Sequence, residues 1–232
     1  MGWETVLRIT MGTVRGGLAP VLLLAGVLTG CGESPEQDPK PPATARAEET
    51  TGAAAKSGGT IGAAGSACEL PVTFALAKGW KAKAVDSGAA SGSSGGSDNE
   101  LAEDVADALL HQGPVTAACE IDAKPAGNIG FLRVWTGSSA DADARTVLRA
   151  FVAAEDNTSK EKYRTFKAGD LSGVEVEYLY TSKLLDEVKK ERALAVSTPD
   201  GPVVLHLGGL DTEEHEAMLP AYELAKRTLR VA

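Results

Sequence analysis

The sequence is poor in positive charge, in histidine and in aromatic residues. Its 232 residues carry 23 Lys and Arg against 32 Asp and Glu, for a net charge of −9, and only 5% are aromatic. Binding to phosphates takes a net basic face that releases counterions, so this balance argues against nucleic acid or an anionic membrane surface as the main partner. The 3 His and 3 Cys residues show no HExxH or CxxC spacing, and such spacings mark many metal and redox sites.

A complete catalytic motif is also lacking. Residues 92–96 read Gly-Ser-Ser-Gly-Gly and match G-x-S-x-G, but a nucleophile elbow requires a strand before it and a helix directly after it. His215 follows Asp211 by four residues, which offers two metal ligands without a third, and an acidic first helical turn is the simpler interpretation. We therefore expect a protein that is not an enzyme, with no catalytic residue, no metal and no cofactor.

The first 30 residues have the pattern of an export signal. Arg8 and Arg15 precede an apolar run over residues 18–28, which is too short to span a bilayer as a helix. Both Arg15 and the apolar run survive if translation starts at Met11, so Met1 and Met11 remain alternative starts.

The run Leu28-Thr29-Gly30-Cys31 resembles the lipobox of bacterial lipoproteins. The resemblance implies cleavage before Cys31 and a diacylglycerol thioether on its sulfur, and two acyl chains suffice for stable anchoring. An ordinary secretory signal with an accidental cysteine is the alternative. The resemblance implies a protein at the cell membrane, anchored by lipid on the extracytoplasmic side.

Two regions follow the export signal. Residues 31–65 are rich in Pro, Ala, Gly, Thr and Glu, and this composition predicts a disordered tether. Residues 66–232 alternate apolar and polar segments, which predicts a single globular domain. Removal of residues 1–30 takes away one Glu and two Arg, so the mature protein has a net charge of −10.

Cys68 and Cys119 are the only cysteines that remain once Cys31 is lipidated. An even pair in an exported domain favours a disulfide, because nothing outside the cytosol keeps thiols reduced. A pair of separate free thiols is the alternative.

Hydrophobic periodicity predicts an α+β domain in which an antiparallel sheet is flanked by helices. Residues 86–99 are Gly and Ser without an apolar anchor and predict a flexible loop. Ser139 is the expected cap of the second helix, and Asp211 with Glu214 opens the last one. The expected strands are residues 72–76 and 80–85 as a hairpin, 115–123, 129–135, 163–168, 173–181, 191–198 and 202–208, and the expected helices are 100–112, 140–154 and 211–229.

A family resemblance is carried by residues 70–74 (LPVTF), followed by Lys78-Gly79-Trp80. This run resembles the opening hairpin of PsbP-like domains, and the later element order is similar too. With the lipobox, the tether and the length, the chain is most similar to LpqN-type lipoproteins of actinobacteria. The resemblance implies an α/β/α sandwich that acts as a binding or assembly module, and it matches no family ligand site to residues here.

The strand aromatics are candidates for a cleft. Period two places Phe131, Arg133 and Trp135 on one face of a strand, and an arginine between two aromatics must be paired or reach water. Together with Trp80 they form the candidate ligand or partner groove. Core packing of the aromatics is the alternative, and His206 is expected to be a satisfied structural histidine.

These observations favour a membrane-anchored, non-catalytic binding or assembly module for another envelope protein, whose identity the sequence does not reveal. A carrier of a small apolar or lipidic ligand is the second hypothesis. A hydrolase or metalloenzyme is the third hypothesis. The observation that would distinguish it from the other two is a His that reaches a carboxylate or Ser in a concave site.

Overall fold

A computed structural model describes residues 55–86, 109–140 and 142–232. The export signal, Cys31, most of the expected tether and the Gly/Ser loop after residue 86 lie outside the described residues, as does most of the expected helix over 100–112. None of the helices in the described part of the chain has the length and apolarity that a membrane crossing requires.

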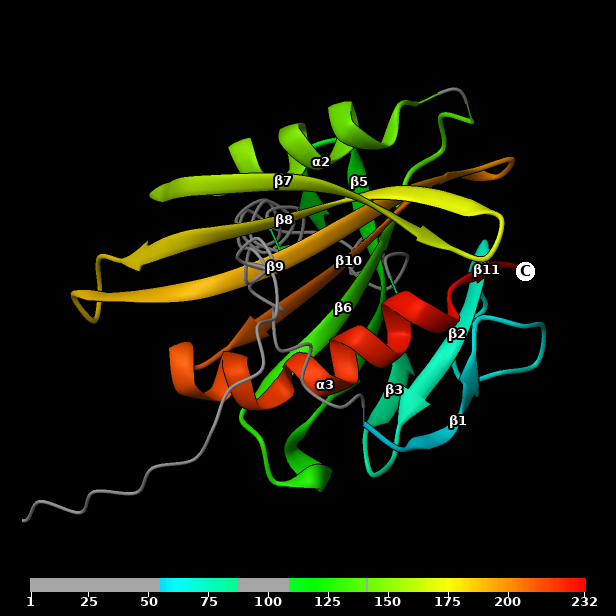
Figure 1. Cartoon of the computed structure of the whole chain (residues 1–232), viewed down its shortest axis with the longest axis horizontal. Coiled ribbons are helices and arrows are strands. Elements are labelled where there is room, and N and C mark those ends of the chain that lie inside the picture. Colours follow the sequence, from blue (N-terminus) through cyan, green and yellow to red (C-terminus); the bar gives the residue numbers. More distant parts are fainter. Residues whose placement is uncertain (1–54, 87–108, 141) are drawn as a thin grey trace, which may run out of the picture. The chain divides into compact units, whose positions relative to one another are not determined.

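One large antiparallel sheet organises the domain (Figure 1). Its strand order is β3-β5-β6-β10-β9-β8-β7, and β4 pairs with the first two residues of β5. All its pairings are antiparallel, which confirms the predicted sheet type. The strands are β3 (Lys81–Ala84), β4 (His111–Gln112), β5 (Val115–Asp122), β6 (Gly130–Thr136), β7 (Thr158–Ala168), β8 (Leu171–Ser182), β9 (Glu187–Thr198) and β10 (Gly201–Gly209).

A second sheet of three strands packs beside α3 (Figure 1). It contains β1 (Ser57–Ile61), β2 (Val72–Ala77) and β11 (Arg230–Val231), with β2 in the centre. The predicted hairpin of β2 with β3 is wrong, because the two strands belong to different sheets. Gly79, with φ +89°, turns the chain between them, and β3 then pairs with β5.

The two helices cover opposite faces of the large sheet (Figure 1). α2 (Ala144–Ala153) packs on β8, β9 and β10, whereas α3 (Thr212–Thr228) packs on β10, β9 and β2. Alternation along β10 feeds both cores: Val203, Leu205 and Leu207 belong to the α3 core, and Val204 belongs to the α2 core. The α/β/α arrangement is therefore a consequence of period two in central strands that are buried on both sides.

Local caps fix where the two helices begin. The Asp143 side chain accepts from the Thr146 amide at 2.8 Å and starts α2, so the prediction of Ser139 as the cap is wrong by four residues. Asp211 accepts from the Glu214 amide at 2.8 Å, and this predicted start of α3 is confirmed. Pro220 lies inside α3. His111 and Gln112, expected at the end of a helix, form β4 instead.

The ordered domain begins earlier than the predicted boundary at residue 66. β1 pairs with β2, and the Ile61 side chain at its end is only 4% exposed. Ahead of it, the Ala55 amide donates to the Pro220 carbonyl at 3.0 Å. The segment SGGTI has no alternation to reveal a strand, because its stability comes from backbone pairing with β2 rather than from its own apolar side chains.

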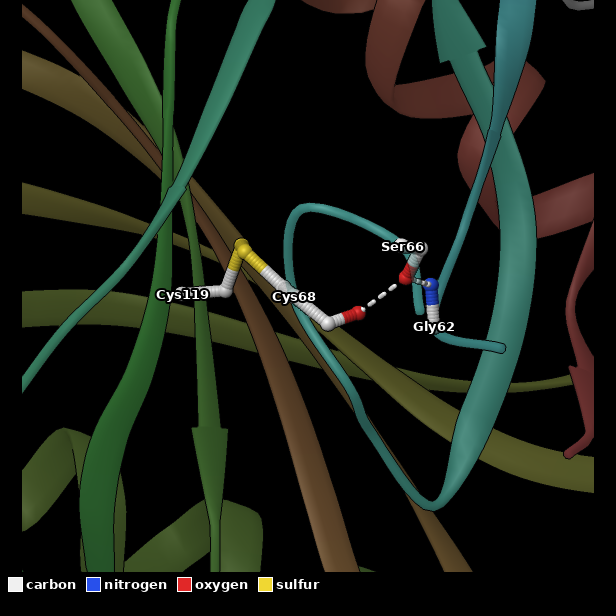
Figure 2. The surroundings of a disulfide bond; sticks show 4 residues. All are labelled: Gly62, Ser66, Cys68 and Cys119. Carbon is white, nitrogen blue, oxygen red and sulfur yellow. Dashed lines mark hydrogen bonds between the residues drawn. A yellow bond between two sulfur atoms is a disulfide. The ribbon is translucent and has the colours of Figure 1, made fainter. Parts of the chain in front are cut away.

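The predicted disulfide between Cys68 and Cys119 is present (Figure 2). It joins the segment between β1 and β2 to β5, with a Cα–Cα distance of 5.9 Å. The loop that carries Cys68 is closed by the Ser66 hydroxyl, which donates to the Cys68 carbonyl at 2.6 Å and accepts from the Gly62 amide at 3.1 Å. The bridge thus fastens the small sheet to the large one.

Candidate functional site

A pocket of about 330 Å³ opens on the α2 face of the large sheet. We call it the His206 pocket. Its walls come from β6, β9 and β10 and from the residues at the ends of β6 and β10. On these strands the wall positions lie next to those that contribute to the α2 core. It is lined by Ile129, Gly130, Phe131, Arg133, Lys189, Glu191, His206, Gly208, Gly209 and Leu210.

Four polar side chains meet at the inner side of this pocket. The Tyr178 hydroxyl from β8 lies 2.8 Å from Glu155 Oε2, 3.4 Å from Glu191 Oε2 and 3.1 Å from His206 Nε2. His206 Nε2 also hydrogen-bonds Glu191 Oε2 directly. Glu155 lies in the turn after α2, and three neighbouring strands supply Tyr178, Glu191 and His206. We call these four residues the Tyr178 cluster.

Glu191 is a buried carboxylate whose charge is compensated on two sides. It is 2% exposed, and Lys189 Nζ lies 2.7 Å from its Oε1 atom. Burial opposes ionisation of Glu191, but the neighbouring His206 and Lys189 outweigh it and lower its pKa to about 2. The group therefore stays ionised inside the protein.

Glu155 and Tyr178 respond in the opposite direction. Burial and the nearby Glu191 charge raise the pKa of the Glu155 carboxyl. Burial and the same Glu191 charge raise the pKa of the Tyr178 hydroxyl well above its usual value of 10. Tyr178 is thus a neutral hydrogen-bond donor between two acidic groups.

Phe131 and Arg133 line the His206 pocket, on the face of β6 where the sequence places them. Arg133 binds Glu120 Oε2 through Nε and Nη2, at 3.1 and 2.6 Å. Its guanidinium also lies over the rings of Phe131 and Trp135, at 5.7 and 5.9 Å from their centroids. Arg133 is therefore paired, and it stacks along one wall of the pocket.

The two tryptophans of the candidate groove do not line this pocket. Trp135 is buried in the α2 core, where its ring meets Phe151 edge-on at 5.5 Å. Trp80 is buried in the α3 core on the opposite side of the sheet. The four predicted residues consequently do not form one groove, and the alternative of core packing describes both tryptophans.

Sequence reasoning missed Glu155, Glu191 and Lys189, and it expected only a structural role for His206. A signal was present in the alternation: Glu191 occupies the same face of β9 as the buried Ala193 and Ala195, and His206 the same face of β10 as Val204. The contact that a hydrolase or metalloenzyme would need is also present, because His206 reaches the Glu191 carboxylate at the edge of a concave site.

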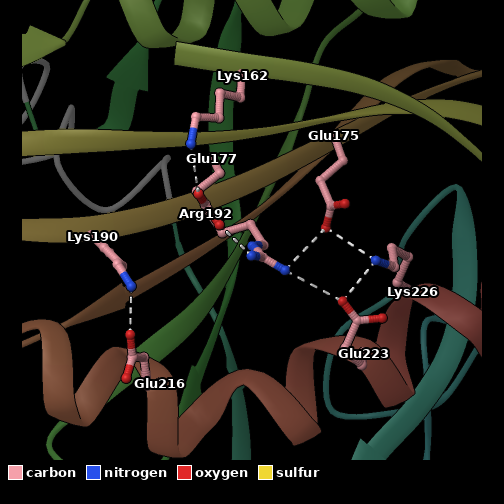
Figure 3. A network of polar contacts seen from close by, with 8 residues as sticks. All are labelled: Lys162, Glu175, Glu177, Lys190, Arg192, Glu216, Glu223 and Lys226. Carbon is pink, nitrogen blue, oxygen red and sulfur yellow. Dashed lines mark hydrogen bonds and ion pairs between the residues drawn. The ribbon is translucent and has the colours of Figure 1, made fainter. Parts of the chain in front are cut away.

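A second polar network lies on the α3 face (Figure 3). Arg192 Nη2 binds Glu177 Oε2 at 2.5 Å, and its Nη1 lies 3.6 Å from Glu223 Oε1. Lys226 Nζ binds both Glu175 and Glu223, at 3.1 and 2.7 Å. Because every carboxylate in it faces a cation, we interpret this network as the link between α3 and the sheet.

The Arg192 network borders a second pocket of about 600 Å³ between α3 and β7, β8 and β9. His215 contributes to its lining and is 1% exposed. Its Nδ1 atom has no hydrogen-bond partner among the described residues. Burial, with a smaller contribution from Arg192, lowers the pKa of His215 to about 4.

Together these features define an α+β domain with a sheet covered on both faces and a charged pocket at one end. The profile of a protein family described as "Uncharacterised lipoprotein" matches residues 38–229. The chain belongs to this family, which implies attachment to a membrane through lipid. No curated protein matches the chain significantly.

Among solved structures, the chain is similar to cyanobacterial PsbP (CyanoP) from Synechocystis sp. PCC 6803. The two share 11% sequence identity and a TM-score of 0.41, over 70% of this chain and 87% of that one.

Proposed function

We propose that this lipoprotein is a non-catalytic binding module on the extracytoplasmic side of the cell membrane, anchored through Cys31, that docks on another envelope protein. The resemblance to LpqN-type lipoproteins supports the same assignment. The observation that carries the proposal is a concentration of exposed apolar side chains at one end of the large sheet.

Seven large hydrophobic residues of the described chain are exposed. Four of them lie where β8 turns into β9 and where β10 leads into α3, and a fifth, just before β6, is hydrogen-bonded through its backbone to the residue after β10. We call these five the apolar rim: Ile129, Leu184, Leu185, Val188 and Leu210. Leu184 is 92% exposed at the tip of the hairpin, which projects past the beginning of α3 (Figure 1). Exposed apolar surface gathered in one region marks interaction sites on soluble domains.

The apolar rim continues into the His206 pocket. Ile129 and Leu210 line the pocket, and the Leu210 amide donates to the Ile129 carbonyl at 3.0 Å. Lys189, one residue after Val188, donates to the Gly209 carbonyl at 2.9 Å and thereby ties the β8–β9 hairpin to the end of β10. A partner side chain that entered the pocket would thus meet the apolar side chains of Ile129, Phe131 and Leu210 beside charged and polar ones.

Charge favours a protein partner over the bilayer. Lys189 and Lys190 are already paired with Glu191 and Glu216, at 2.7 and 2.5 Å. The hairpin tip then carries Lys183 against Asp186 and Glu187, on a mature chain of net charge −10. Such a surface repels anionic lipid and fits an apolar protein surface flanked by basic residues.

The test is site-specific photo-crosslinking in the cell envelope, with the full-length lipidated protein. A photoreactive amino acid placed at Leu184 is expected to capture one protein, and the same amino acid at Val231, which is also exposed but lies on β11, is not. The purified partner is then expected to bind the Leu184→Asp/Leu185→Asp variant at least about tenfold more weakly than the parent. Val231→Asp serves as the matched control.

Three results would overturn the proposal. They are capture of lipid alone at Leu184, capture of a second copy of this chain alone, and equal affinity of the hairpin variant and the Val231 control for the partner.

The carrier of a small ligand is a second candidate, and the size of the His206 pocket favours it. About 330 Å³ falls at the lower end of the volumes that small ligands occupy. If this function holds, the lipoprotein purified from membranes retains a small molecule in native mass spectrometry, and Gly208→Leu, which fills the pocket, releases it. A ligand-free spectrum for the parent protein would argue against it.

A further inference from the structure

The Tyr178 cluster brings metal-ligating atoms together from elements that are distant in the sequence. One ligand atom each from Glu155, Glu191 and His206 lies within 4.8 Å of both others. Glu155 is placed by the end of α2, Glu191 by β9 and His206 by β10. Each side chain therefore has a position fixed by packed secondary structure, as a preformed metal site requires.

The spacing of these atoms suits a small tetrahedral site. Metal–ligand bonds of about 2.0–2.1 Å to nitrogen and oxygen put neighbouring ligand atoms of a tetrahedron about 3.3 Å apart. The Tyr178 hydroxyl lies 2.8, 3.1 and 3.4 Å from the Glu155, His206 and Glu191 atoms. The Tyr178 hydroxyl thus lies close to all three ligand atoms. His206 Nε2 and Glu191 Oε2, which are in direct hydrogen-bond contact, must move apart to admit an ion between them.

The donor set also selects the kind of ion. Ca²⁺ takes six to eight oxygen ligands and Mg²⁺ retains several waters, whereas an imidazole nitrogen with two carboxylates is typical of zinc and similar transition metals. Two carboxylates converge here in a largely buried position, and each raises the cost of ionising the other. A divalent cation between them would relieve that repulsion.

Lys189 does not block the coordinating atoms. Its Nζ binds Glu191 Oε1, whereas Glu191 Oε2 is the atom that faces His206. Lys189 can therefore hold the Glu191 carboxylate in place from outside, as the outer partners of metal ligands commonly do. The His206 pocket, which Glu191 and His206 line, gives an ion a path from solvent.

We propose that Glu155, Glu191 and His206 form a binding site for one divalent transition-metal ion of the zinc type, with Lys189 as a positioning residue. Binding replaces the hydrogen bond between His206 and Glu191 by two metal–ligand bonds. The ion then joins the end of α2 to the two central strands beneath it. The site shares the His206 pocket with the apolar rim, but ion binding does not require the partner proposed above.

The experiment titrates Zn²⁺ alone into the full-length protein after chelator treatment, with isothermal calorimetry as the readout. We expect one ion per chain, and we expect Glu155→Gln and His206→Gln to weaken binding by at least about 100-fold each. The control is His111→Gln, which alters an exposed histidine of β4 and should leave the affinity unchanged. Co²⁺ in place of Zn²⁺ should give visible d–d absorption that both ligand variants lose.

Folding of the variants is checked separately, because Glu191 and His206 support each other in the metal-free protein. Glu155→Gln is the safer variant, since Glu155 is only partly buried and the amide retains a hydrogen bond from Tyr178. Absence of stoichiometric Zn²⁺ uptake by the parent would overturn the site. So would equal affinity in Glu155→Gln, provided that its circular dichroism matches that of the parent.

Discussion

Arg192 on β9 reaches Glu177 on β8 across two paired strands, with Nη2 and Oε2 2.5 Å apart on the face that α3 covers. The same guanidinium lies near Glu175 and Glu223, so three carboxylates share one arginine. The Arg192 side chain is 18% exposed. The arrangement links α3 to the sheet by charge at a place that solvent reaches only in part.

Replacement of Arg192 should therefore cost more than loss of one surface ion pair. We expect Arg192→Met to lower the free energy of unfolding by about 2–3 kcal/mol, because Glu175, Glu177 and Glu223 lose a shared partner in a poorly hydrated position. Lys162→Met is the control: its side chain is 66% exposed and 4.0 Å from Glu177, so it should cost less than about 0.5 kcal/mol. Urea unfolding at neutral pH measures both, and similar losses for the two variants would contradict the prediction.

His215 should make the stability of the domain depend on pH. Its pKa of about 4 in the folded protein lies below the ordinary value of about 6.5 for an unfolded chain. Unfolding therefore takes up a proton between these values, and stability rises with pH across this window and is lost as the pH falls through it. Near the buried ring, Arg192 disfavours protonation, while Glu177 and Glu191 favour it.

The full effect amounts to about 3 kcal/mol between pH 7 and pH 4. We expect the free energy of unfolding of the parent protein to fall by that order over this range, and His215→Gln to flatten the curve. His111→Gln should leave the slope as it is. A slope that persists unchanged in His215→Gln would show that other groups carry the pH dependence.

The disulfide between Cys68 and Cys119 closes a sequence separation of 51 residues. On the loop-entropy relation, such a bridge restricts the unfolded chain by about 4 kcal/mol. We expect the Cys68→Ser/Cys119→Ser double variant to lose stability of that order. Removal should also loosen the small sheet first, because Cys68 connects it to β5, so amide exchange should accelerate in β1 and β2 more than in β9 and β10. Equal acceleration in all four strands would contradict this expectation.

The parts of the fold that could be predicted from the sequence are those set by local signals. The hairpin of β9 and β10 follows from the turn 199–201, and the start of α3 follows from the cap at Asp211. The pairing of β2 could not be found in this way, because Lys78-Gly79 indicates only that the chain turns. Its partners β1 and β11 are a glycine-rich segment and two C-terminal residues without alternation.

Only parts of the candidate site could be predicted from the sequence. Period two correctly grouped Phe131 and Arg133 on one face of a strand, since that grouping needs only the strand itself. Glu155, Glu191 and His206 meet because of the register between β9 and β10 and the position where α2 ends. A sequence without its strand pairing does not contain these distances. The alternation can therefore mark Glu191 and His206 as polar residues on buried strand faces, but it cannot show that they meet each other and Glu155.

Gly201 shows how strictly the turn between β9 and β10 depends on its residue. Its φ is +119°, and a Cβ atom there would lie 2.0 Å from the Gly137 carbonyl oxygen. Gly127 also has a positive φ, +94°, but a Cβ atom there would meet nothing within 4 Å. Substitution by Ala at either position costs about 1–2 kcal/mol of stability through backbone strain. Only Gly201→Ala adds a collision with main-chain atoms.

The pair of variants separates these two contributions. We expect Gly127→Ala to lower the free energy of unfolding by about 1 kcal/mol and Gly201→Ala by at least about 3 kcal/mol, because the Gly137 backbone must move before a methyl group fits. β10 begins at this turn and carries His206 further along. Gly201→Ala should therefore also perturb the NMR signals of β9 and β10 at the turn and near His206. Equal destabilisation by the two substitutions would mean that the turn relaxes freely, and that the approach of Gly137 does not restrict it.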